Sequence, residues 1–312
     1  MSDIAVSVLM PCYNAERTVA GAIASVLAQT VPVAEIVTVD DGSTDRTYDI
    51  LSNLARIHSG VITLVRQTHG GIANARTAAL RAARSPWVLP VDADDRLLPE
   101  GLRLLTEYVL DHPHVDVVYG DYQLMDSGGT PGEVVSIRSR RIDPLDGAIL
   151  ATVMWENVAS ATSLIRRSSA LAVGGYDSFS AEAGREVDGF EDVYLWLRLL
   201  AQGAHFGYLA QPLYEYRVHP GSSSNDTARV RAAKVASFAG LFAHSPRPAA
   251  EAFVAMVQRR AEQLRDAFET IVARDRQVES LLREMDLARE FQDGQEKTIE
   301  SLRSLLEERS RD

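Results

Sequence analysis

The sequence predicts an α/β fold, with a doubly wound and mostly parallel sheet that has helices on both faces, followed by a C-terminal helical extension. Strand-like and helix-like segments alternate through residues 5–91, the pattern of parallel strands joined by crossover helices. Polar residues follow the ends of several of these strands. Between Ala249 and Arg309 there is no proline and a single glycine, Gly294, which is typical of a long helix.

The alternating elements are assigned from the spacing of apolar residues. Apolar runs without helical spacing predict strands, and apolar residues that recur every three to four positions predict helices. The predicted strands are residues 5–10, 34–39, 61–65 and 87–91, and the predicted helices between them are residues 15–27, 44–57 and 71–83. Ligands of such sheets bind beyond the carboxyl ends of the strands, so we expect the functional site there.

The second part of the chain mixes strands and helices less regularly. Residues 139–157 fit no pattern that we can assign, and residues 245–248, with two prolines, predict a hinge before the long helix. The remaining expected elements are a helix over 97–110, strands over 115–125, 134–137 and 160–165, a helix over 193–201, and two short strands over 205–209 and 213–218.

Composition narrows the classes of function. The chain has 312 residues, of which 46% are hydrophobic and 24% charged, an ordinary globular composition. Its net charge of −11 argues against a nucleic-acid partner. The single cysteine, Cys12, excludes an internal disulfide and a cysteine metal cluster; with nothing basic beside it in sequence, Cys12 is expected to be inert.

Neither a signal peptide nor a membrane-spanning segment is expected. The N-terminal residues lack a basic region, and their apolar run ends early, at Pro11. No apolar stretch approaches the roughly 18 uninterrupted residues of a transmembrane helix. We therefore expect a cytoplasmic protein, for which peripheral association with a membrane stays open.

Three carboxylates, Asp92, Asp94 and Asp95, follow the predicted strand 87–91. If the chain stays extended, Asp92 and Asp94 point to the same side. Two such carboxylates suit Mg2+ or Mn2+, which keep open positions for phosphate oxygens. The plainer alternative is that Asp95 caps the helix whose first turn contains Pro99, since an isolated DxD motif is weak.

Other strand ends carry polar groups as well. Tyr13 and Asn14 follow the first strand, and Asp40 and Asp41 end the second. Chance placement does not predict this convergence on one edge. The chain lacks the GxGxxG fingerprint and a GK[ST] loop, which argues against a dinucleotide enzyme and a P-loop ATPase.

Seven motifs of the chain resemble those of the family 2 glycosyltransferases, which have a GT-A fold, and the resemblance covers roughly residues 4–220. Each motif alone is weak, but seven in the family's order form a strong signal. They are PCYNAE (Pro11–Glu16), VDDGSTD (Val39–Asp45), HGGIANAR (His69–Arg76), DADD (Asp92–Asp95), GGYD (Gly174–Asp177), FED (Phe190–Asp192) followed by LWLRL, and RVHPGSSS (Arg217–Ser224).

The resemblance implies an inverting, metal-dependent enzyme. It would transfer a sugar from a nucleotide-diphosphate-sugar donor to a hydroxyl acceptor in the synthesis of a glycan or a cell-surface polysaccharide. The domains would be a GT-A domain over 1–225, with a nucleotide-sugar-binding half (1–100) and an acceptor and catalytic half (101–225), and a helical extension over 226–312, with a coiled coil from about residue 249.

The resemblance also implies roles for single residues. Asp192 would be the catalytic base with Glu191 beside it, and Asp94 and His219 would bind Mn2+ or Mg2+. Tyr13, Glu16 and Asp41 would contact the base or ribose, with Asp92 facing the ribose. The donor-binding set as a whole is Pro11, Tyr13, Asn14, Glu16, Asp41, Arg76, Asp92 and Asp94.

The proposed chemistry needs these residue types. Charge develops on the leaving diphosphate, and a cation placed in advance stabilises it. A positioned carboxylate that accepts the proton of the acceptor hydroxyl contributes roughly 100- to 10,000-fold. Near a helix start, the helix dipole helps to keep a carboxylate such as Asp192 ionised.

Each of these residues also has a plainer interpretation. Asp192 would be only a helix N-cap, His219 a histidine hydrogen-bonded in a turn, Asp41 a turn former, and Arg76 a surface residue of its helix.

The chain departs from the family's pattern at two places. The family's ARNxG is here Ala75-Arg76-Thr77-Ala78-Ala79, without the asparagine and the glycine, which puts the packing of that helix start in question. Pro90 stands in a strand, where a free N–H would normally join the ladder.

The C-terminal segment has the spacing of a coiled-coil seam. Its apolar residues alternate three and four apart, and Asp275 interrupts them. We expect a homo-oligomer or a partner helix; packing onto the catalytic domain and a solvated, frayed helix are the alternatives. The seam residues are Leu264, Phe268, Ile271, Val278, Leu282 and Met285.

Two rival functions remain at this point. One is a donor-binding scaffold without turnover that acts through the coiled coil. The other is a nucleotidyltransferase of similar sheet topology, which would release pyrophosphate. The acidic set of Asp92, Asp94 and Asp192 favours the glycosyltransferase, and the FED and RVHPGSSS motifs speak against a nucleotidyltransferase.

Overall fold

The computed structural model describes residues 4–137, 159–177, 190–219 and 227–309. The chain divides into two compact units, Met1–Met256 and Val257–Asp312. Helix α9 (Thr227–His244) and the first turns of α10 (Pro246–Arg309) contribute Leu241, Ala249 and Ala252 to a core of the first unit. The domain limits given above stay a prediction.

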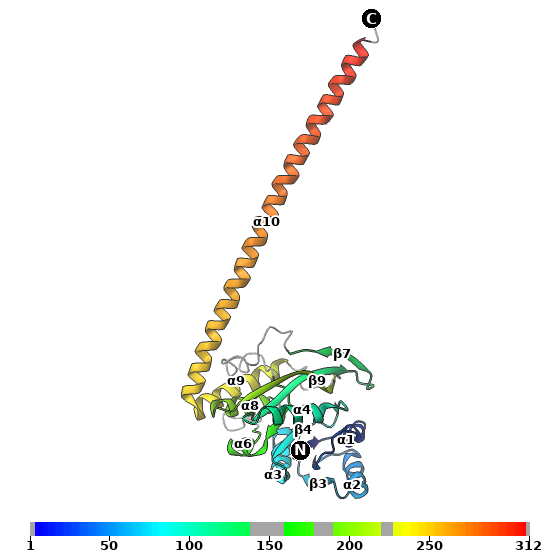
Figure 1. Cartoon of the computed structure of the whole chain (residues 1–312), viewed down its shortest axis with the longest axis vertical. Coiled ribbons are helices and arrows are strands. Elements are labelled where there is room, and N and C mark those ends of the chain that lie inside the picture. The colour runs from blue at the N-terminus through cyan, green and yellow to red at the C-terminus, as the bar shows by residue number, and fades with distance from the viewer. Residues whose placement is uncertain (1–3, 138–158, 178–189, 220–226, 310–312) are drawn as a thin grey trace. The chain divides into compact units, whose positions relative to one another are not determined.

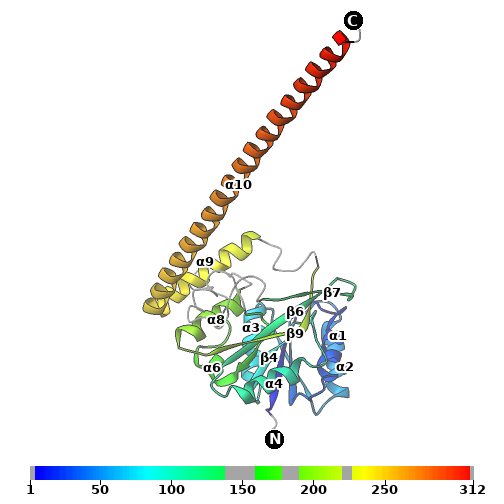
Figure 2. The ribbon, with the colours of Figure 1, turned by 45° about the horizontal axis from the view of Figure 1, so that its top comes forward.

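A single mixed sheet organises the first unit (Figures 1 and 2). Among the described residues it has nine strands in the order β3-β2-β1-β4-β8-β6-β9-β5, with β7 beside β6. The pairs β1–β2, β2–β3, β1–β4 and β6–β9 are parallel. The strands are β1 Val6–Cys12, β2 Glu35–Asp41, β3 Ile62–Gln67, β4 Trp87–Pro90, β5 Arg96–Leu97, β6 Val117–Met125, β7 Pro131–Val135, β8 Leu164–Arg166 and β9 Phe206–Arg217.

Helices cover both faces of the sheet, as predicted. One core contains side chains of α1 (Val19–Leu27), α2 (Thr47–Ile57) and α4 (Gly101–Asp111). The other contains side chains of α3 (Ile72–Ala82), α6 (Arg167–Ala172), α8 (Glu191–Ala201) and α9. Val8 and Met10 of β1 belong to the first core and Leu9 to the second, because strand side chains alternate between the two faces.

The two strands expected over 205–209 and 213–218 form one strand, β9, so that expectation is wrong. Its pairing with β6 shifts register where Leu209 opposes Gly120 and Pro212 opposes Asp121. A bulge accommodates Pro212 without ending the strand. Glycine suits position 120, because a Cβ there would lie 2.8 Å from the carbonyl oxygen of Leu209.

Pro90 fits its strand for a simple geometric reason. The N–H of Val91 donates to the carbonyl of Leu9 on β1 at 2.9 Å, so the nitrogen of Pro90 faces away from β1. On that other side, β4 pairs with β8 at Trp87 and Val88. A proline at position 90 therefore costs the described ladder no hydrogen bond.

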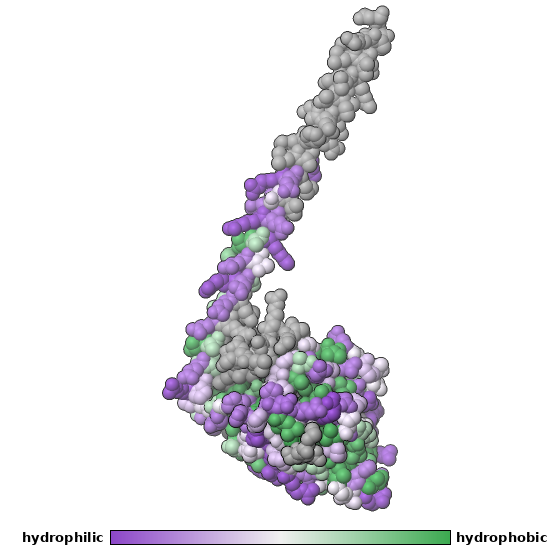
Figure 3. Space-filling model, in the orientation of Figure 1, coloured by the Kyte–Doolittle hydropathy of each residue, from purple (hydrophilic) through white to green (hydrophobic). Residues whose placement is uncertain are grey.

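The segment expected to be a hinge, residues 245–248, contains the boundary between two C-terminal helices. Helix α9 ends at His244, and α10 begins at Pro246, a position at which proline is well tolerated. Along α10 the described side chains are mostly hydrophilic (Figure 3), but Leu264, Phe268 and Ile271 are more than half exposed. In the described part of the chain, no helix is long and apolar enough to cross a membrane. The unassigned segment 139–157 lies outside the described residues.

Candidate functional site

A pocket of about 670 Å³ lies at the carboxyl edge of the parallel strands. Its walls come from the loops that follow β1, β2, β3 and β4 and from the end of β9. The structure thus gathers segments that are far apart in the sequence. The predicted site residues that line it are Pro11, Tyr13, Asn14, Glu16, Asp41, Asp92, Asp94 and His219.

Asp94 and His219 meet at this pocket. Oδ2 of Asp94 lies 3.2 Å from Nε2 of His219, and both side chains are about one-third exposed, at 38% and 34%. Burial, together with the charge of Asp92, raises the pKa of Asp94, and the hydrogen bond from His219 opposes that shift. The pair offers one oxygen and one nitrogen ligand. Among the described residues no cluster of three or more His, Cys, Asp or Glu forms a complete metal site.

The aspartates do not continue β4 as an extended strand. The N–H of Asp95 donates to the carbonyl of Asp92 at 3.1 Å, which closes a turn, so the extended geometry considered from the sequence is wrong. Asp95 is 3% exposed and accepts a hydrogen bond from the N–H of Arg217. Helix α4 begins only at Gly101; Asp95 is therefore not its cap.

Arg217 holds this turn in place. Its Nε donates to the carbonyl of Asp94 at 2.8 Å. Its Nη1 donates to the carbonyls of Asp126 and Ser127, each at 3.1 Å. One buried guanidinium thus ties the aspartate turn to the loop between β6 and β7.

Arg76 connects the pocket to the start of α8. It is 2% exposed, so the surface interpretation is wrong. Its Nη2 lies 2.6 Å from Oδ1 of Asp92, and its Nη1 forms an ion pair with Glu191. Burial opposes the charge of Arg76, but Asp92 and Glu191 outweigh burial and raise its pKa well above the ordinary value. The side chain lies behind Asp92 and not in the pocket wall.

Glu191 and Asp192 open helix α8. The N-cap residue is Phe190, at φ 74°, so Asp192 is not the cap and lies in the first turn. Burial raises the pKa of Asp192, against the effect of Arg76. Burial likewise raises the pKa of Glu191, to about 7. Neither residue lines the pocket. Glu191 is linked to the pocket through its ion pair with Arg76, which in turn pairs with Asp92.

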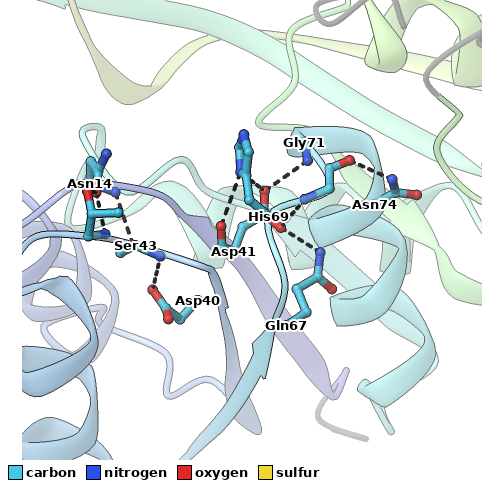
Figure 4. A network of polar contacts seen from close by, with 10 residues as sticks. Asn14, Asp40, Asp41, Ser43, Gln67, His69, Gly71 and Asn74 are labelled. Atoms are coloured by element: carbon cyan, nitrogen blue, oxygen red, sulfur yellow. Dashed lines mark hydrogen bonds and ion pairs between the residues drawn. The ribbon is translucent and has the colours of Figure 1, made fainter.

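Asn14 and Glu16 join the loops that follow β1 and β2. Asn14, at φ 49°, accepts the N–H of Thr44 at 2.9 Å. Asp45 accepts the N–H of Glu16, and Glu16 accepts the N–H of Arg46, each at 3.1 Å. Figure 4 shows the Asn14 end of this connection. These contacts shape one pocket wall, while the donor contacts of Asn14 and Glu16 stay predictions.

Asp41 is enclosed by protein donors (Figure 4). It is 2% exposed, and its Oδ1 accepts from the Gln67 side chain and from the N–H of Gly70. Its Oδ2 accepts from the N–H of Gly71 and contacts Nδ1 of His69, both at 2.9 Å. The ring of His69 stacks on Tyr13, with centroids 4.1 Å apart. Asp41 is thus more than a turn former, because it organises the loop after β3.

Comparison with known proteins decides the family. Residues 7–169, more than half of the chain, match the family model described as "Glycosyl transferase family 2". The chain belongs to this family. It is a glycosyltransferase, as the motifs predicted.

Relatives and solved structures agree with this assignment. EpsE of Bacillus subtilis (strain 168) is 29% identical over 68% of this chain and 72% of that protein. The UDP-Glc:alpha-D-GlcNAc-diphosphoundecaprenol beta-1,3-glucosyltransferase WfgD of Escherichia coli is 32% identical, over 44% of this chain and about half of its own length, 53%.

Two solved structures share the GT-A fold with this glycosyltransferase. One is S. aureus TarS 1–349 in complex with UDP, at 21% identity and a TM-score of 0.59, which covers 80% of this chain and 70% of TarS 1–349. The other is the mannosyltransferase PcManGT from Pyrobaculum calidifontis in complex with GDP-Man and Mn2+, at 21% identity and a TM-score of 0.59. This match covers 80% of this chain and 69% of PcManGT.

At the departure from the ARNxG pattern, a threonine side chain takes part in the packing of the helix start. Thr77 stands where the family has asparagine. Its Oγ1 donates to the carbonyl of Tyr176 and accepts the N–H of Tyr176, both at 2.9 Å. Gly175, at φ 81°, packs closely against the Thr77 side chain. The hydroxyl therefore links α3 to the GGYD segment.

Sequence reasoning missed some residues of the pocket wall. His69 follows the end of β3, the strand whose carboxyl end was not considered, and Arg217 lies two positions before His219. Both residues belong to motifs quoted above. Their positions at the ends of β3 and β9 could have indicated that they line the site. Cys12 behaves as predicted: it is buried, and burial raises the pKa of its thiol, so the thiolate is disfavoured.

Proposed function

We propose that this enzyme transfers a sugar, with inversion and with help from a divalent cation, from a nucleotide-diphosphate-sugar donor to a hydroxyl acceptor. The observation that carries the proposal is the Asp94–His219 pair in a pocket at the carboxyl edge of the sheet. Such edges are where open α/β sheets bind their ligands. Family membership favours this enzyme over a donor-binding scaffold.

The ligand atoms suit Mn2+ or Mg2+. A carboxylate oxygen and an imidazole nitrogen 3.2 Å apart can share one cation, and a cation with two protein ligands keeps positions for phosphate oxygens. When bound, such a cation stabilises negative charge on the leaving diphosphate. The presence of Mn2+ with GDP-Man in PcManGT, and of UDP-GlcNAc in S. aureus TarS 1–349, supports the same donor class here.

Asp192 is the proposed base that accepts the proton of the acceptor hydroxyl. It lies in the first turn of α8, where the helix dipole favours its ionised form. Glu191 precedes Asp192 in the chain, and Arg76 forms ion pairs with both Glu191 and Asp92. The buried guanidinium therefore sets the position of the base relative to the donor pocket.

We propose an acceptor that belongs to a cell-surface polysaccharide. The support comes from the names of relatives, WfgD and the poly(ribitol-phosphate) beta-glucosyltransferase of Bacillus spizizenii, which is 27% identical over 51% of this chain and 25% of that protein. A cytoplasmic location and peripheral association with a membrane stay predictions.

We also propose that the long helix pairs two copies of the chain. Leu264, Phe268 and Ile271 are 57–66% exposed on α10, and their spacing of four and three places them on one face. A lone helix would leave this apolar stripe in water. A second copy offers the same stripe, so the two can bury each other.

The direct test of the reaction is a screen of nucleotide sugars. Release of nucleoside diphosphate is measured for UDP-, GDP- and dTDP-sugars, with and without Mn2+, in the presence of simple hydroxyl acceptors. We expect turnover of at least one donor only when the cation is present. Donor binding without any turnover would favour the scaffold instead, and pyrophosphate released from a nucleoside triphosphate would indicate a nucleotidyltransferase.

A further inference from the structure

Helix α9 and the first turns of α10 form a hairpin with a single residue, Ser245, between the two helices (Figure 2). One side of the hairpin is fully buried: Ser237 and Leu241 on α9 and Ala249 on α10 are each 0% exposed. This packing fixes the rotation of both helices about their axes. The residues on the opposite side of the hairpin are therefore held towards solvent.

That opposite side carries large apolar residues. On α9, Val235 is 68% and Phe242 39% exposed, and on α10, Phe253 is 46% and Val254 54% exposed. The rings of Phe242 and Phe253 meet edge to face, with centroids 6.3 Å apart, so the two helices contribute to one surface. We call these four residues the hairpin surface. Single exposed apolar residues are ordinary, but a group of them marks a place where something docks.

The charge of the segment indicates what docks there. Residues 227–260 carry six basic side chains and one acidic side chain, Glu251, whereas the whole chain has a net charge of −11. Positive charge is thus concentrated around the hairpin in an otherwise acidic protein. The basic residues of the segment are Arg229, Arg231, Lys234, Arg247, Arg259 and Arg260.

An anionic lipid bilayer matches both properties. Its headgroup boundary accepts exposed apolar side chains, and its phosphate groups attract lysine and arginine. Repulsion between the bilayer and acidic parts of the chain farther away is screened beyond about 10 Å at ordinary salt. A second copy of the chain fits less well, because it would bring the same positive charge against this segment.

We propose that the hairpin surface docks the enzyme onto an anionic lipid bilayer. The four apolar side chains enter the headgroup boundary, and the basic side chains of residues 227–260 pair with lipid phosphates. This inference does not depend on the proposed sugar transfer, because docking involves neither the pocket at the strand ends nor its cation.

The test is sedimentation of the full chain with lipid vesicles. Wild type should bind vesicles of phosphatidylglycerol and phosphatidylcholine in equal parts at least about tenfold more tightly than vesicles of phosphatidylcholine alone, and high salt should weaken this binding. Val235→Gln with Val254→Gln removes apolar contacts and should weaken binding by about tenfold or more. Arg229→Gln with Arg231→Gln removes charge and should weaken it by about tenfold or more as well.

The matched control is Ile57→Gln with Leu110→Gln. These residues of α2 and α4 are 56% and 47% exposed but lie outside the hairpin, so this variant should bind vesicles as wild type does. Circular dichroism checks the fold of every variant. Release of nucleoside diphosphate, measured without vesicles, should be the same in all of them, so docking and sugar transfer are tested separately.

Two results would overturn the proposal. One is a wild-type chain that does not bind the anionic vesicles. The other is vesicle binding that stays at the wild-type level in both hairpin variants. If the valine variant instead lowered the mass measured by light scattering and left vesicle binding unchanged, the hairpin surface would be an interface between copies of the chain.

Discussion

Asp192 is the residue that we propose as the catalytic base. It lies in the first turn of α8, burial raises its pKa, and Arg76 opposes that shift. The sequence could propose this residue because the FED motif, which resembles the family's pattern, consists of consecutive residues. It could not predict that Glu191, the residue beside Asp192, is joined to the pocket through Arg76 and Asp92, since these partners meet only after folding.

Asp192→Asn should separate binding from catalysis. The amide keeps the shape of the carboxylate but cannot accept the proton, so kcat should fall by roughly 100- to 10,000-fold. The dissociation constant of the nucleoside diphosphate, measured by calorimetry, should stay within about twofold of wild type, because the substitution changes no contact that binds the donor. If binding and turnover fell together, Asp192 would be a structural residue of the helix start.

Activity should depend on pH through Asp192. Burial raises the pKa of this carboxyl, so the ionised form needed by a base is lost at a higher pH than for an ordinary aspartate. With the cation saturating, kcat/KM should therefore decline as the pH falls, by up to about tenfold per unit. A rate that stays constant down to pH 5 would argue against a base with a raised pKa.

At the scale of elements, local patterns predicted the alternating half of the fold. Strands β1 to β4 and their helices have apolar periodicities that the sequence shows directly. Strand β9 was wrongly predicted as two strands, because a proline such as Pro212 usually ends a strand. In the structure β9 continues past Pro212, because its pairing with β6 contains a bulge there. The turn at Asp92–Asp95 was not foreseen, since its geometry depends on Arg217 from a strand far along the chain.

The link between α3 and the GGYD segment should be a stability determinant. Thr77→Val removes the hydroxyl and leaves the buried N–H and C=O of Tyr176 without this partner, so the free energy of unfolding should fall by about 1–3 kcal/mol. Urea denaturation followed by circular dichroism measures this.

Thr106→Val is the matched control for Thr77→Val. Thr106 is equally buried on α4, at 7% against 8% exposure, but its hydroxyl donates only to carbonyls of its own helix. The free energy of unfolding of Thr106→Val should fall by less than about 0.5 kcal/mol. Equal losses in the two variants would remove the special role of Thr77.

At the scale of the whole molecule, we predict that α10 joins two copies of the chain into a dimer. Leu264→Asp with Ile271→Asp places two charges on the exposed apolar stripe, and these should turn a dimer into a monomer in light scattering after size exclusion. The control is Ala273→Asp with Ser280→Asp, two exposed positions on the opposite face of the heptad, which should leave the dimer intact. A wild-type chain of monomeric mass would contradict the pairing.

Cation-assisted binding of a diphosphate at the strand ends is the claim on which the proposed function depends. It is tested most directly by calorimetric titration of UDP and GDP into the full-length enzyme, with and without Mn2+, in the wild type and in Asp94→Ala. We predict that Mn2+ strengthens binding of at least one nucleotide by about tenfold or more in the wild type and has no effect in Asp94→Ala. Binding that is equally tight with and without Mn2+ in the wild type, or an undiminished Mn2+ effect in Asp94→Ala, would contradict it.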